Sequence, residues 1–142
     1  LSLLDALPIF NNRFMSALFL AGSLLTPNAA MAHHATCADL HAAAFLDEPD
    51  ELSELLDHGA DLNCRDALKQ TPLITATDGA SLDIVKILLH QGVSINERDE
   101  VGQTALAKAR QKLAFFDMDG GQGYRTIYRE IIDRLEQAGA RE

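Results

Sequence analysis

The sequence predicts an all-α repeat protein, a solenoid in which similar helical units stack on one another. Two stretches, 57–66 and 90–99, match one another at a spacing of 33 residues. The same register continues beyond them, because the run 70–73 falls on 103–106. Apolar residues between the matched segments, at 84–89, recur at helical spacing. A fixed period in this range is typical of repeat proteins, whose units bury their apolar faces only against their neighbours.

The first helix of the central unit is predicted to begin beside Thr71. The Thr71 hydroxyl suits the position that caps a helix N-terminus, and Pro72 suits the first helical position. Leu73 and Ala76 lie three residues apart and therefore share one face of this helix. The small side chain of Ala76 keeps stacked helices close to one another.

The second helix of this unit is predicted from an amphipathic stripe at spacings i, i+1, i+4 and i+5. Its members are Ile84, Val85, Leu88 and Leu89. Gly92 follows the stripe where a left-handed residue can end a helix, and Gly59 and Gly139 follow the corresponding helices of the other units. In the first unit, Pro49 begins the second helix.

The third unit is longer than the other two. Gly139 lies 47 residues after Gly92 instead of 33, so about 14 extra residues stand between Arg110 and Ile127. The glycine-rich run 117–123 starts like a calcium-binding loop but lacks its later acidic ligands, so we expect a mobile loop there. The flanking aromatic residues either pack over the end of the stack or present an apolar contact surface; they are Phe115, Phe116 and Tyr124.

Together these positions resemble the ankyrin repeat. The central unit carries the fullest pattern, namely Thr71-Pro72-Leu73, Ala76, the run 82–89, Gly92, Ile95-Asn96 and Asp99. The first and third units match at fewer positions. The histidine that the family places after Thr-Pro-Leu is present as His41 but is replaced by Ile74 and Ala107. A hydrogen bond that the family makes through this histidine is therefore expected in the first unit alone.

The resemblance implies an ankyrin-like solenoid of helix-turn-helix units with β-hairpin loops, occupying 33–142. The implied units span about 38–70, 71–103 and 104–142, with an insertion at about 111–126. Three units are near the minimum for a stable stack.

The amino-terminal part of the chain has a different character. Residues 11–32 are predicted to be a secretory signal peptide, with Arg13 as its positive flank, an apolar core at 15–25 and a small-residue cleavage site at Ala30-Met31-Ala32. A buried helix is the alternative reading. Bacterial export to the periplasm, or secretion, follows from the first reading, with a mature chain beginning near His33. Residues 1–10 look like a non-native, adapter-derived extension.

Charge excludes some classes of partner. The formal net charge of the 142-residue chain is −9, and it stays −9 when residues 1–32 are removed. A chain this acidic should not bind nucleic acid or anionic lipid non-specifically, but it suits a basic protein partner. The apolar core of the signal peptide is too short to span a membrane. We therefore expect no membrane-spanning segment in the mature form. The sequence contains no recognisable catalytic motif, so we expect neither an enzyme nor a cofactor.

The only two cysteines are Cys37 and Cys64. Cys37 lies at the start of the first unit, and Cys64 lies in the loop that ends it; an ankyrin-like arrangement brings these regions near each other. Export permits a disulfide between them, which would stabilise the terminal unit by roughly 3.5 kcal/mol in the chain-entropy model. Two free thiols are the alternative.

The resemblance implies a protein–protein interaction module that is monomeric when free. Ankyrin-like proteins usually bind through their hairpin tips and the inner face of their first helices. By position, the tip candidates are Arg65, Ala67, Leu68, Lys69, Arg98, Glu100 and Val101. The candidates on the inner helices are Thr75, Asp78 and Lys108.

Two further functions remain open. One is an inhibitor or immunity-type partner of an exported enzyme. The other is a periplasmic redox or metal accessory protein that uses the cysteine pair and the histidines His33 and His34, which would otherwise belong to a disordered tail. The two are separable, because tip substitutions should impair the first, and cysteine or histidine substitutions the second.

Overall fold

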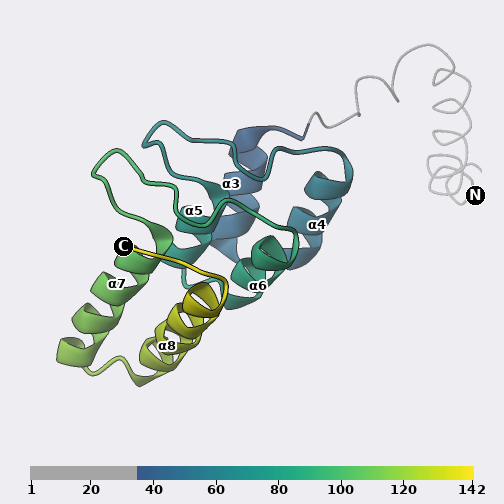
Figure 1. Cartoon of the computed structure of the whole chain (residues 1–142). Helices are drawn as coiled ribbons and strands as arrows, with labels where there is room; N and C mark the ends of the chain where they lie inside the picture. The colour runs from purple at the N-terminus through teal and green to yellow at the C-terminus, as the bar shows by residue number, and fades with distance from the viewer. Residues whose placement is uncertain (1–34) are drawn as a thin grey trace, which may run out of the picture. The chain divides into compact units, whose positions relative to one another are not determined.

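The computed structural model describes residues 35–142 (Figure 1). The predicted extension, the signal peptide and His33-His34 lie outside the described residues. Within the described part, the helices are α3 (Cys37–Leu46), α4 (Pro49–Asp57), α5 (Pro72–Asp78), α6 (Leu82–His90), α7 (Ala105–Asp119) and α8 (Gln122–Gln137). Each predicted unit therefore contributes one pair of helices.

The helix pairs stack in two layers, as the solenoid prediction requires. Helix α5 packs between α3 and α7, and α6 packs between α4 and α8. The two helices of each unit also pack against each other. Each unit therefore buries its apolar surface against its neighbours, which confirms the ankyrin-like solenoid.

Threonine caps begin the first helix of every unit. The hydroxyls of Thr36, Thr71 and Thr104 accept hydrogen bonds from the backbone N–H groups three residues later. Because these N–H groups have no partner within the helix itself, each cap satisfies one of them. Just beyond the C-terminus of α6, Gly92 adopts the predicted left-handed conformation with φ of 80°.

The loops between units are tight turns, and no β-strand occurs between residues 35 and 142. Two backbone bonds close each turn. Asp66 N donates to Gln70 O at 3.1 Å and Lys69 N donates to Asp66 O at 3.0 Å, and the corresponding bonds of the next repeat, from Asp99 N to Gln103 O and from Gly102 N to Asp99 O, are both 3.0 Å. The aspartate side chains accept two further N–H groups per turn. The hairpin shape is therefore present without a strand ladder, because side chains satisfy groups that a ladder would otherwise pair.

One hydrophobic core runs through all three units. Leu73, Leu88 and Leu106, one from each of α5, α6 and α7, are at most 2% exposed and belong to the same cluster. Tyr128 from α8 closes the cluster at the end of the third unit and is 2% exposed. The core is continuous, so the units are mutually dependent.

The prediction of a mobile loop in the third unit is wrong. The extra residues continue α7 to Asp119 and begin α8 at Gln122, with Gly120 and Gly121 as the whole connection. Gly120 has φ of 75° and ends α7. The apolar and aromatic side chains of the inserted segment favour helix packing over a loop, since they find partners across the two helices. Both helices consequently extend beyond the rest of the stack (Figure 1).

None of the helices between residues 35 and 142 is both long enough and apolar enough to cross a bilayer.

Candidate protein-binding face

Two aspartates shape the loop tips that the sequence predicts to contact a partner. Asp66 Oδ1 accepts hydrogen bonds from the N–H groups of Leu68 and Gln70, both at 2.9 Å. One repeat later, Asp99 Oδ1 accepts the corresponding bonds from Val101 and Gln103 at 3.0 and 2.9 Å. These local bonds hold each turn in one conformation, with the apolar residue at its outer end.

The two tips are also joined to each other. The N–H of Glu100 donates to the carbonyl of Leu68 at 3.0 Å. Arg65 Nη1 donates to the carbonyl of Arg98 at 2.9 Å, and its guanidinium pairs with the Glu97 carboxylate. Figure 1 shows the two loops running side by side above the helices. The tips therefore form one connected surface instead of two independent loops.

The tip surface exposes two large apolar side chains. Leu68 is 50% exposed and Val101 is 72% exposed. Neither belongs to the core cluster. Exposed apolar residues on a rigid turn are typical of contact residues at an interface.

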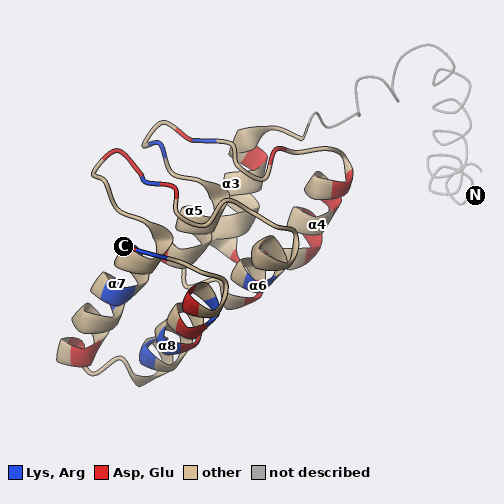
Figure 2. Cartoon of the chain, viewed as in Figure 1, with Lys and Arg blue, Asp and Glu red and all other residues tan. Residues whose placement is uncertain are grey.

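Charged residues of both signs lie along the same two loops (Figure 2). Lys69, Arg98 and Glu100 are exposed. Arg98 Nη1 donates to the Gly102 carbonyl at 2.6 Å, which holds its side chain against its own turn. Lys69 has a left-handed backbone with φ of 58°, at the position where the next repeat has Gly102. The surface thus has an apolar centre and a rim of mixed charge.

The three candidates on the inner helices are placed differently. Thr75 is 6% exposed and Lys108 is 8% exposed. Lys108 Nζ lies 3.5 Å from the carboxylate of Asp99, so this lysine forms an ion pair with the aspartate that shapes the second tip. Asp78 is partly exposed and pairs with Lys112 at 2.9 Å. Thr75 and Lys108 therefore have internal partners in the free chain, and we leave both out of the proposed contact surface.

His41 takes the structural role expected from the family resemblance. Its Nδ1 lies 2.7 Å from the hydroxyl of Thr75, and both side chains are buried. Burial lowers the pKa of His41 below its ordinary value, against the smaller opposing effects of the Asp66 carboxylate and the Cys64 backbone. The histidine is therefore held neutral and links α3 to α5.

Cys37 and Cys64 are joined as a disulfide, with 5.9 Å between their Cα atoms. The bond connects the first turn of α3 to the loop that follows α4. It ties together the two ends of the first unit.

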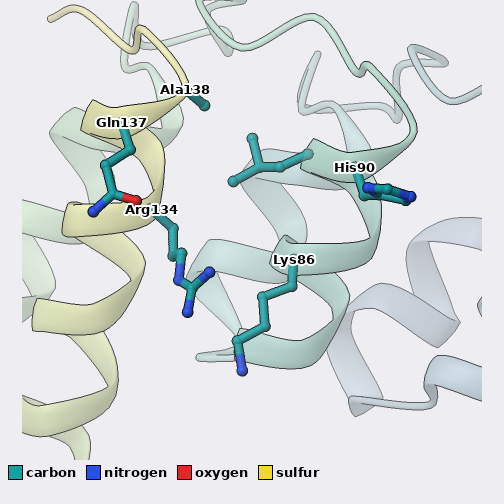
Figure 3. Close-up of a pocket in the computed structure, with 6 residues that line it drawn as sticks. Lys86, His90, Arg134, Gln137 and Ala138 are labelled. Atoms are coloured by element: carbon teal, nitrogen blue, oxygen red, sulfur yellow. The ribbon is translucent and has the colours of Figure 1, made fainter.

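A shallow groove between α6 and α8 forms a second surface feature (Figure 3). Lys86 and Arg134 face into it from opposite sides. Each already pairs with an acid on its own helix, Lys86 with Asp83 at 3.2 Å and Arg134 with Glu130 at 2.9 Å. The groove therefore offers little uncompensated positive charge to an anionic ligand.

Sequence reasoning missed the exposed Phe45 and Leu46 at the end of α3. In the third unit it missed one exposed apolar residue and left two others undecided. Met118 is 91% exposed, while Phe115 and Tyr124 are 59% and 52% exposed. All three lie on the extended parts of α7 and α8. The spacing of three between Phe115 and Met118 is the available signal, since it places both on one face once the segment is taken as helical.

Comparisons with known proteins agree with this geometry. A family model described as "Ankyrin repeats (3 copies)" matches residues 40–115. The Transient receptor potential cation channel subfamily A member 1 of Drosophila melanogaster is 35% identical over 83 residues, which is 58% of this chain and 6% of that protein. The Arf-GAP with coiled-coil, ANK repeat and PH domain-containing protein 2 of Homo sapiens is 38% identical over 72 residues, or 49% of this chain and 9% of that protein.

A shorter relative shows the same pattern. The Ankyrin repeat and SOCS box protein 6 of Mus musculus is 38% identical over 72 residues, covering 49% of this chain and 17% of that protein. In each case the chain spans less than a fifth of the relative's length.

Proposed function

Because the chain belongs to the ankyrin repeat family, we propose that it is an exported, non-catalytic protein-binding module whose joined loop tips contact another protein. The observation that carries this proposal is the exposed pair Leu68 and Val101 on turns held by internal hydrogen bonds. A surface that is already ordered loses little conformational entropy on binding.

The composition of the tip surface indicates the kind of partner. Apolar anchors at the centre supply most of the binding energy in typical interfaces, while a charged rim contributes orientation and association rate. The net charge of −9 favours a partner that is basic overall, whereas the rim of the tips carries both signs of charge. The partner that we propose is therefore a basic protein with a small apolar pocket bordered by residues of both charges.

Export is the second part of the proposal. It rests on the predicted signal peptide at 11–32, and the Cys37–Cys64 disulfide supports it, because disulfides persist mainly in oxidising compartments. The periplasm is the proposed location. Inhibition of an exported enzyme is a more specific form of the same function, since a stiff tip surface suits occlusion of another protein's site.

The test is affinity capture from the native periplasmic or secreted fraction, followed by measurement of Kd with the purified partner. Leu68→Asp combined with Val101→Asp should weaken binding by at least about tenfold, because central apolar contacts each contribute about 2 kcal/mol or more. Met118→Asp is the matched control, since Met118 is even more exposed than the tip residues but lies on the α7 extension. It should leave Kd unchanged.

Circular dichroism and thermal unfolding must first show that both variants fold like the parent chain. A partner that the tip variant still binds with the parental Kd would contradict the proposal. So would a partner whose binding is lost in the Met118 variant alone, because that result would move the interface to α7 and α8.

A further inference from the structure

Three residues with strong metal-binding side chains converge in the first unit. The Sγ atoms of Cys37 and Cys64 and a ring nitrogen of His41 all lie within 4.8 Å of one another. Cys37 and His41 are four residues apart on α3 and so share one of its faces. Cys64 reaches the same place from the loop after α4. The fold therefore brings the chain's two cysteines to one buried histidine.

The hydrogen bonds of His41 determine which nitrogen is available. Thr75 Oγ1 lies 2.7 Å from His41 Nδ1 and donates its own proton to Gln70 Oε1 at 3.4 Å. With Thr75 donating to Gln70, its oxygen accepts from Nδ1–H, and in this tautomer the lone pair of the neutral ring is on Nε2. Within the described part of the chain, Nε2 is buried and has no hydrogen-bond partner. A buried polar atom without a partner is uncommon and calls for an explanation.

We propose that, when its two cysteines are reduced, this cluster binds one Cu⁺ ion through Cys37 Sγ, Cys64 Sγ and His41 Nε2. Thiolates are soft ligands that favour Cu⁺, and imidazole is a common partner to them. The bond from His41 Nδ1 to Thr75 is the outer contact that typically orients a metal-binding imidazole. The site goes beyond protein binding, and it borders the first loop tip, because Asp66 Oδ2 lies 4.0 Å from His41 Nδ1.

The dimensions of the cluster suit such an ion. Bonds of about 2.0–2.3 Å from a metal to nitrogen or sulfur let two ligand atoms lie at most about 4.6 Å apart. A ring nitrogen of His41 already lies within 4.8 Å of both Sγ atoms, which are bonded to each other in the disulfide and move apart once it is reduced. Structural zinc sites almost always have four ligands, whereas the cluster supplies three. The number of ligands and their softness therefore favour Cu⁺ over Zn²⁺.

Loading the site requires reduction of the disulfide. Two molecules of a low-molecular-weight thiol supply two electrons and two protons, so that the Cys37–Cys64 bond becomes two thiols and the reductant becomes its own disulfide. Cu⁺ then replaces both thiol protons, which pass to solvent. The product is a bis-thiolate copper complex completed by the neutral His41 ring. The same residues thus alternate between a structural crosslink and a copper site.

The test uses the full chain, reduced with dithiothreitol, desalted without oxygen and titrated with Cu⁺ against bicinchoninate. We expect one Cu⁺ per chain, with X-ray absorption showing two sulfur ligands and one nitrogen ligand. The spectrum of the parent chain tests the ligand set without relying on any variant. Absence of Cu⁺ binding, or Zn²⁺ binding tightly enough to displace Cu⁺, would overturn the proposal.

Single substitutions test which residues bind the copper ion. His41→Gln should weaken Cu⁺ binding by at least about tenfold and remove the nitrogen ligand, while Cys37→Ser should abolish the two-sulfur spectrum. His58→Gln is the matched control, because His58 is exposed and bonds to the Glu54 carbonyl in the same unit. His33→Ala combined with His34→Ala should also retain the site. Copper lost in this last variant, or unchanged binding by His41→Gln, would contradict the assignment.

Discussion

At the scale of single residues, Tyr128 joins the extended third unit to the central one. It is the largest fully buried side chain described, and its hydroxyl donates to the carbonyl of Asp78 at 3.2 Å. Burial raises the pKa of Tyr128 from 10.0 to about 12, with a smaller contribution from the Asp78 charge. The fold therefore accepts this side chain only in its neutral form.

This shift predicts a specific loss of stability in alkali. The pKa of Tyr128 is higher in the folded chain than in the unfolded chain. Its contribution to the free energy of unfolding is therefore complete below pH 10 and is lost as the pH rises towards about 12. Between pH 8 and pH 11, urea unfolding should show that the parent chain loses about 1 kcal/mol more than Tyr128→Phe.

Tyr124→Phe is the control for this measurement, because Tyr124 is 52% exposed. It should follow the parent chain between the two pH values. Equal losses in the parent chain and in Tyr128→Phe would show that other groups cause the alkaline effect.

At the scale of elements, the α7–α8 extension is held together by aromatic packing. The ring of Phe116 stacks on Tyr124 and Tyr128, with centroid distances of 4.8 and 5.8 Å. A Cβ atom added at Gly121 would lie 2.9 Å from the Phe116 ring, so the connection between α7 and α8 passes close to that ring. The extension is thus a packed element with its own small aromatic cluster.

Adjacent phenylalanines allow this packing to be measured. Phe116→Ala should lower the free energy of unfolding by about 2 kcal/mol, less than for a fully buried ring because Phe116 is partly exposed. Phe115→Ala should change it by less than about 0.5 kcal/mol, since Phe115 is 59% exposed. Urea unfolding followed by circular dichroism gives both values. Similar effects of the two substitutions would contradict the assigned packing.

At the scale of the whole molecule, stability depends on neighbouring units sharing one core. Among residues 35–142, the first unit packs only against α5 and α6, and the disulfide adds a covalent tie within that unit. The crosslink closes a segment of 27 residues, which limits the freedom of the unfolded chain.

Removing the crosslink should therefore destabilise the metal-free protein. Cys37→Ser combined with Cys64→Ser should lower the free energy of unfolding by roughly 3.5 kcal/mol, and hydrogen exchange should quicken first in α3 and α4. Dithiothreitol should reproduce this loss in the parent chain and have no effect on the variant. An unchanged unfolding midpoint after reduction of the parent chain would show that the crosslink does not stabilise the fold.

The predicted tip residues illustrate how far the sequence alone reaches. Leu68 and Val101 occupy equivalent positions in a 33-residue repeat, so their exposure on matching turns follows from the pattern. Thr75 is on a predictable helix, yet its burial depends on His41, which lies 34 residues away. Local pattern places a residue on an element, but only packing decides whether it faces solvent.

The sequence by itself determined the 33-residue period, the threonine caps of the first helices, the glycines that follow the second helices, and one continuous core. These features depend on nearby residues or on spacings that recur. Only the tertiary structure decided that the third unit's insertion continues as helix, and that Cys37, His41 and Cys64 converge. Both outcomes arise from contacts between segments distant along the chain, where no repeat or local propensity specifies the partner.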